Sequence, residues 1–180
     1  MKFEDVLGNQ VLILDGAMGT MVQNLELDDA AFGGAAFKML TDLLIFSRPD
    51  DLEGIHLKYL QAGANLIETN TFGASPLRLK EFDFTQIDVA DIKVIPQALD
   101  LKKSDYFAIT HHLNVEGCRI ARKAIDNYKN EPDYDGRPLF VAGSIGPSNY
   151  VLSKTEADLN KATWDQIVEN NLKQVRGLVE

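Results

Sequence analysis

Cysteine is almost absent from this sequence: Cys118 is the only one among 180 residues. A single cysteine excludes an intramolecular disulfide, and it cannot by itself supply the several thiolates of a cysteine-rich metal site. The sequence also lacks any apolar run close to the roughly 20 residues that a membrane-spanning helix needs. We therefore expect neither a disulfide nor a membrane span.

Basic residues are fewer than acidic ones: the sequence has 18 Lys and Arg and 27 Asp and Glu, and its formal net charge is -9. This charge repels phosphate backbones, and no basic stripe with interleaved aromatic residues appears, so nucleic acid is not an expected partner. The first residues, MKFEDVLGNQ, lack the basic start, apolar stretch and cleavage site of a secretory signal. We expect a cytoplasmic protein.

What the sequence does contain is a series of short apolar blocks, each followed by small and polar residues. These blocks are residues 11–15 (VLILD), 64–70 (ANLIETN) and 139–142 (LFVA). Blocks of this length and composition are typical of buried strands in a parallel sheet. We predict an α/β protein with three parallel strands, in which helices make the right-handed crossovers.

Helical spacing of apolar residues occupies the intervals between these blocks. It predicts a short helix over 18–25, a helix from Pro49 to Gly63, a helix over 114–128 and a last helix that Thr163 caps. Residues 82–105 show no sustained period, and we interpret them as an excursion from the core or an insertion.

In parallel α/β folds the functional groups gather where strands end. At the first strand end, DGAMGT (15–20), the glycines allow close approach of a ligand, and successive N–H groups suit a carboxylate. Asp15 can accept from an ammonium group. The alternative is that Asp15 caps the next helix and the glycines only form a tight turn.

The second strand end carries Glu68, Thr69 and Asn70, where a purely structural strand would carry apolar side chains. Because a buried carboxylate must be paired to offset its desolvation, this favours a binding role. The third end, GSIGPSN (143–149), offers Ser144 as a donor, but its glycines and proline favour a loop-shaping role.

At these motifs the sequence resembles the homocysteine S-methyltransferase family. The matching segments are LILDGAMGTMVQ, LIFSRPDDLEGIHLKYLQAGANLIETNTFGAS, NVEGCRIARKA and FVAGSIGPSN, in the family's order. The similarity is greatest to the N-terminal homocysteine-binding module of the cobalamin-dependent methionine synthase branch. It covers nearly the whole chain apart from residues 82–105.

The resemblance implies a (β/α)8 barrel of the TIM type in which zinc activates the thiol of homocysteine for methyl transfer. In the methionine synthase branch methylcobalamin is the donor, and cobalamin- and folate-binding modules belong to the same longer chain; other relatives use methylated sulfur or nitrogen compounds. The resemblance also assigns site residues. Those that match the substrate loops are Asp15, Gly16, Ala17, Met18, Gly19, Thr20, Glu68, Thr69 and Asn70.

The sequence departs from the family at the metal site. The family's zinc cysteines lie in GxNC and GGCCG segments, which are absent here, and Cys118 matches none of them. Three strands cannot close an eight-stranded barrel. We therefore expect residues 1–180 to be the N-terminal part of one barrel domain, about its first three βα units.

Such a fragment is expected to hold neither zinc nor cobalamin and to be inactive alone, and its open sheet edges favour aggregation. One alternative is a non-catalytic binding or assembly protein that has kept the substrate loops. Another is an unrelated α/β enzyme that holds phosphate at GSIGPSN, although no Lys or Arg flanks that loop.

Overall fold

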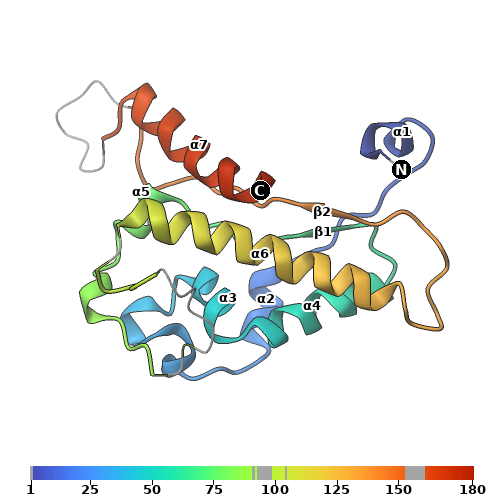
Figure 1. The fold of residues 1–180 in the computed structure, drawn as a ribbon, viewed down its shortest axis with the longest axis horizontal. Helices are drawn as coiled ribbons and strands as arrows, with labels where there is room; N and C mark the ends of the chain where they lie inside the picture. Colours follow the sequence, from blue (N-terminus) through green and yellow to red (C-terminus); the bar gives the residue numbers. More distant parts are fainter. Residues whose placement is uncertain (1, 91, 93–98, 104, 153–160) are drawn as a thin grey trace.

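The computed structural model describes residues 2–90, 92, 99–103, 105–152 and 161–180. Its regular elements surround a small parallel sheet (Figure 1). They are α1 (Phe3–Leu7), α2 (Met18–Gln23), η1 (Asp29–Phe32), η2 (Ala35–Phe37), η3 (Thr41–Leu43), α3 (Leu44–Ser47), α4 (Pro49–Gln61), β1 (Leu66–Glu68), α5 (Pro76–Leu79), η4 (Phe84–Gln86), α6 (Tyr106–Tyr128), β2 (Phe140–Ala142) and α7 (Trp164–Val179). None of the helices in the described ranges is long and apolar enough to cross a membrane.

The three predicted strand segments lie side by side in chain order and run parallel. β1 and β2 pair with Ile67 opposite Val141. Residues 11–15 join β1 through a single parallel bridge, Leu14 to Leu66. The protein thus has the predicted α/β arrangement around a parallel sheet, but the first segment of the sheet is not a regular strand.

That first segment is also not buried, which corrects the expectation from its apolar sequence. Val11 is 90% exposed, and Ile13 and Leu14 are exposed as well. Apolar side chains of this kind are typical of a buried strand, yet Val11, Ile13 and Leu14 are exposed, although α1 reaches the sheet nearby, where Phe3 packs against Phe140.

The helices cover one face of the sheet. α4 contacts β1, and α6 contacts β2 (Figure 1). Because side chains alternate along a strand, Ile67 points into the helical layer and is fully buried. Leu66 and Glu68 occupy the opposite face and are half-buried. Glu68 therefore lies on the face opposite α4 and α6.

Most helix boundaries follow from local signals in the sequence. α4 begins with Pro49, and Gly63 beyond its end has a φ of 108°. Thr163 caps α7 in a capping box with Gln166. α6 is longer than predicted: it begins at Tyr106, because the Asp105 side chain caps it by accepting from the N–H of Ala108 at 2.7 Å.

The described part of residues 82–105, which the sequence suggests is an excursion or an insertion, contributes side chains to the core. Phe84, Ile87, Leu99 and Leu101 are buried in the main hydrophobic cluster. Residues 91, 93–98 and 104 of this segment lie outside the described residues. The segment lacks long elements, yet its apolar residues contribute to the core.

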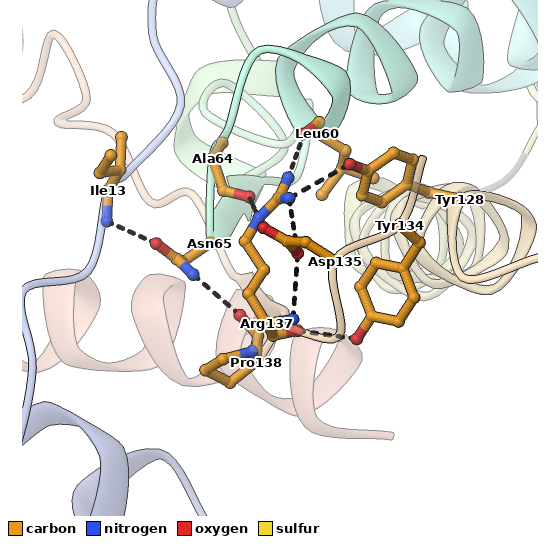
Figure 2. Close-up of polar contacts among 9 residues, drawn as sticks. All are labelled: Ile13, Leu60, Ala64, Asn65, Tyr128, Tyr134, Asp135, Arg137 and Pro138. Carbon is orange, nitrogen blue, oxygen red and sulfur yellow. Dashed lines mark hydrogen bonds and ion pairs between the residues drawn. The ribbon is translucent and has the colours of Figure 1, made fainter. Parts of the chain in front are cut away.

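Arg137 joins the elements at the end of the sheet opposite the predicted site (Figure 2). Its guanidinium donates to the carbonyl oxygens of Leu60, at the end of α4, and Ala64, before β1. It also donates to the Tyr128 hydroxyl at 3.1 Å and to Asp135 at 3.0 Å. One side chain thereby ties α4, α6 and the approaches to both strands together.

Asn65 sets the register of the three parallel segments at the same end (Figure 2). Its side-chain oxygen accepts from the N–H of Ile13 at 3.1 Å, and its side-chain nitrogen donates to the carbonyl of Pro138 at 3.1 Å. Since parallel strands that start in register also end in register, this bond pair aligns the three carboxyl ends at which the site is predicted.

Candidate functional site

Three of the predicted site residues meet where the strand segments end. Asp15 Oδ2 accepts from the backbone N–H of Glu68 at 3.0 Å. The hydroxyl of Ser144 donates to Glu68 Oε2 across 3.5 Å, a long hydrogen bond. The ends of residues 11–15, β1 and β2 therefore each contribute one polar side chain to a common region.

Asp15 has the electrostatic properties of a ligand-binding carboxylate. Its Oδ1 is buried and has no hydrogen-bond partner among the residues that the structure describes. Burial raises the pKa of Asp15 to about 6, and the nearby Glu68 carboxylate adds to this, while the hydrogen bond from the Glu68 N–H acts in the opposite direction. A cationic donor placed at Oδ1 would relieve both the desolvation and the like-charge repulsion.

The competing explanation of Asp15 as a helix cap does not agree with the structure. α2 begins after Ala17, and no side chain caps it. Gly16 and Gly19 are not among the described glycines with positive φ, and a Cβ on Gly19 would have no neighbour within 4 Å. The tight turn thus does not require these glycines. Gly16, Ala17, Gly19 and Thr20 are exposed, and Met18 packs partly against the main core.

Thr69 and Asn70, predicted to line the site, are instead buried and bonded within the protein. Thr69 Oγ1 lies 2.6 Å from Thr71 Oγ1 and accepts from the N–H of Ser144 at 3.0 Å. The side-chain amide of Asn70 donates to the carbonyl of Thr41 at 2.9 Å. At this strand end, Glu68 is the predicted side chain that the structure leaves half-exposed.

The glycines of the third strand end are explained by packing. A Cβ on Gly143 would lie 2.8 Å from the Leu178 side chain, and one on Gly146 would lie 2.6 Å from Phe72. This agrees with the loop-shaping role that the sequence favours for Gly143 and Gly146. Ser144 is the polar side chain between them.

A cavity of about 450 Å³ opens beside the loops that follow β1 and β2, and sequence reasoning missed it. Asp42 lies in its wall, buried, and its Oδ1 accepts from the N–H of Gly73 at 2.9 Å. Burial raises the pKa of Asp42 to about 6. The sequence signal that could have identified Asp42 is its position as the one acidic residue within the apolar run MLTDLLIF. The cavity is lined by Met39, Thr41, Asp42, Phe72, Gly73, Arg78, Pro147 and Asn149.

Comparison with known protein families identifies the family to which this chain belongs. Residues 12–180 match the homocysteine S-methyltransferase family. The chain belongs to this family. The motif resemblance noted in the sequence is thus confirmed at the level of the family.

Solved structures share the fold of this homocysteine S-methyltransferase family member. The metallated form of the homocysteine methyltransferase MmuM from Escherichia coli has a TM-score of 0.65 and 22% identity over 97% of this chain. The oxidized form has a TM-score of 0.66 and 21% identity over 98%. The chain covers 52% of either structure, so it spans about half their length. At these identities the likeness shows the fold alone.

Among the described residues of this family member, no group of three or more His, Cys, Asp or Glu side chains could hold a metal ion. Cys118 is buried, as its place on an apolar helical stripe predicts, and its Sγ lies 3.4 Å from the carbonyl oxygen of Leu178. Burial raises the pKa of the Cys118 thiol, so it is held as the neutral form.

Proposed function

We propose that this chain is the homocysteine-binding N-terminal part of a methionine synthase-type homocysteine S-methyltransferase. In this proposal Asp15 accepts from the substrate ammonium, and the backbone from Gly16 to Thr20 receives its carboxylate. Glu68 and Ser144 complete the polar wall. The observation that carries the proposal is the buried Asp15 Oδ1, which has no partner in the described structure although it lies at the strand ends.

The proposed domain is an incomplete (β/α)8 barrel, about its first three βα units. The parallel order of residues 11–15, β1 and β2 supports this, as does the share of the MmuM chain that is matched. Val11, Ile13 and Leu14 are exposed on the outermost segment of the sheet, beside which further barrel units would lie. Residues 82–105 belong to the same domain, since their described apolar side chains enter its core.

Zinc and cobalamin belong, in this proposal, to the intact cytoplasmic protein. Zinc would lower the pKa of the homocysteine thiol and so supply a thiolate at neutral pH. The described residues do not fit a zinc site, because Cys118 is the only cysteine and is buried in the α6 packing. We therefore assign zinc, methylcobalamin and the folate-binding module to other parts of a longer chain.

This chain's own contribution is to bind and orient the amino-acid end of homocysteine, and no methyl transfer is expected from it alone. Two fixed anchors, an ammonium acceptor and a carboxylate-binding loop, leave the thiol-bearing arm to extend across the open face of the sheet. Positioning of this kind accounts for a large share of enzymatic rate enhancement.

A non-catalytic binding or assembly protein is the second candidate. It is favoured by the outer face of α7, where Trp164, Val168, Leu172 and Val179 are exposed. An apolar stripe of this kind marks an interaction surface. This candidate predicts association of copies or partners and requires no affinity for homocysteine.

The substitution Asp15→Asn tests the proposal. It removes the charge but keeps the shape, and hydrogen bonds to charged groups contribute roughly 1.5–3 kcal/mol, so homocysteine affinity should fall about ten- to a hundredfold. Calorimetry at pH 7.5 measures the affinity, and the thermal midpoint is recorded beside it.

Asp42→Asn is the matched control, because Asp42 is another buried carboxylate whose pKa is raised to about 6 but which already has Gly73 as a partner. It should retain homocysteine affinity. Equal affinities for wild type and Asp15→Asn would remove Asp15 from the site and favour the second candidate.

A further inference from the structure

Gln174 of α7 contacts two of the strand ends at once. Its side chain is fully buried. The amide nitrogen donates to the carbonyl of Thr71 at 2.6 Å, and it also approaches the carbonyl of Ser144 at 3.3 Å. A single side chain thus bridges the loops that follow β1 and β2, although these loops are far apart in the sequence.

The bridge belongs to a closed hydrogen-bond network. Thr71 Oγ1 donates to the Ser144 carbonyl at 2.9 Å, and the Ser144 N–H donates to Thr69 Oγ1 at 3.0 Å. Both backbone groups of Ser144 are therefore bonded to the loop after β1. With its backbone fixed, the Ser144 hydroxyl is left to face Glu68.

The presence of an amide at position 174 is not explained by packing. The buried residues of α7 are Asn170, Gln174 and Gly177, whereas Trp164, Val168, Leu172 and Val179 are exposed. Burying an amide is unfavourable unless it forms hydrogen bonds, and Gln174 Oε1 has no partner in the described structure. It is therefore the side-chain nitrogen of Gln174, the hydrogen-bond donor, that contributes to the fold.

We propose that Gln174 is a positioning residue, which fixes the spacing between Glu68 and Ser144 and thereby the shape of the homocysteine site. The inference rests on the proposed function for its binding readout. α7 runs alongside α6, which packs over β2 (Figure 1), so the helical layer sets the position of the site through this amide.

Gln174→Met tests the proposal, because Met is unbranched and of similar length but cannot donate. Asn170→Leu is the matched control: Asn170 is buried one turn earlier in α7, and its Oδ1 accepts from the N–H of Leu77 at 2.8 Å rather than from a strand end. Two quantities are measured well below both thermal midpoints: homocysteine affinity by calorimetry, and the exchange protection of the Ser144 N–H by NMR.

We expect Gln174→Met to lose about tenfold in affinity and about tenfold in Ser144 protection, since it removes the donor shared by the two loops, although the Thr71 carbonyl keeps the Ala74 N–H and the Ser144 carbonyl keeps the Thr71 hydroxyl. Asn170→Leu should lose neither. Unchanged Ser144 protection in Gln174→Met, or equal losses in both variants, would overturn the inference. If wild type itself failed to bind homocysteine, the proposed function would fall, and the exchange data alone would decide the role of Gln174.

Gln174→Glu is a second variant for the case in which Gln174→Met does not fold. A protonated Glu at 174 has the same shape and can donate, whereas its carboxylate faces two carbonyl oxygens. Ser144 protection should equal that of wild type at pH 5 and fall below it at pH 8. Equal protection at both pH values would overturn the inference.

Discussion

Two aspartates with similar pKa values have different roles in this protein because their partners differ. Burial raises the pKa of both Asp15 and Asp42 to about 6. Asp42 is bonded to the Gly73 N–H and shapes a loop, and a Cβ on Gly73 would lie 2.7 Å from its carboxylate. Asp15 keeps a buried oxygen that no described residue contacts by a hydrogen bond, so it is the one suited to a ligand.

The raised pKa of Asp42 predicts a pH dependence of stability. Its folded-state pKa of about 6 lies above the ordinary 3.8, so the folded state binds the proton more tightly. The stabilisation from protonated Asp42 is complete below about pH 4 and is lost as the pH rises through 6. Between pH 4 and 7, wild type should lose up to about 3 kcal/mol of unfolding free energy relative to Asp42→Asn.

Denaturant unfolding of both proteins across this pH range measures the difference. Asp15 titrates in both proteins and cancels in the comparison. A difference that stays constant with pH would show that the Asp42 pKa is not raised, and a difference of the opposite sign would show that it is depressed.

The polar residues predicted at the strand ends fall into two groups, which differ in their hydrogen-bond partners elsewhere in the chain. Asp15, Glu68 and Ser144 come together as their positions after parallel strands imply. Thr69 and Asn70 look equally suited in the sequence, yet Thr69 bonds to the Ser144 N–H and Asn70 to Thr41. A polar side chain at a strand end can face a ligand or the protein. Which of the two it faces depends on a hydrogen-bond partner that lies far along the chain.

At the scale of elements, local signals predicted most of the helices. Pro49, Gly63 and Thr163 mark boundaries through backbone geometry and capping, which depend on neighbouring residues. The early start of α6 at Tyr106 could also have been predicted from the sequence, since the buried residues Ile109, Thr110 and Leu113 have helical spacing. The burial of Phe84, Ile87, Leu99 and Leu101 could not be predicted, because it depends on tertiary contacts rather than on a periodic pattern.

The exposed stripe of α7 predicts self-association of the isolated chain. Trp164 is 66% and Leu172 48% exposed, on a helix whose buried face is polar. Light scattering should show oligomers or aggregates of wild type, and Leu172→Lys should shift the population toward monomer. Asn171→Lys adds the same charge at an exposed neighbouring position and should not. A wild-type monomer with cooperative unfolding would contradict this prediction.

At the scale of the whole molecule, the α/β class with a parallel sheet and the family were predictable, but the state of the first strand was not. Residues 11–15 have the composition of a buried strand, and they lie parallel to β1 at the correct place. Their exposure depends on what covers the other face of the sheet, which no local pattern encodes. Asp15 at the end of this exposed segment accepts from the Glu68 N–H at the end of β1, so the exposed edge adjoins the proposed site.

We propose that the strand ends carrying Asp15 and Glu68 bind homocysteine through its amino-acid end. Calorimetric titration of the wild-type chain at pH 7.5 with homocysteine and with 4-mercaptobutanoic acid, which lacks the amino group, tests it most directly. We predict saturable binding of homocysteine and binding weaker by about tenfold or more for the analogue, because the analogue cannot donate to Asp15. Equal binding of the two compounds, or no binding of homocysteine, would contradict the claim.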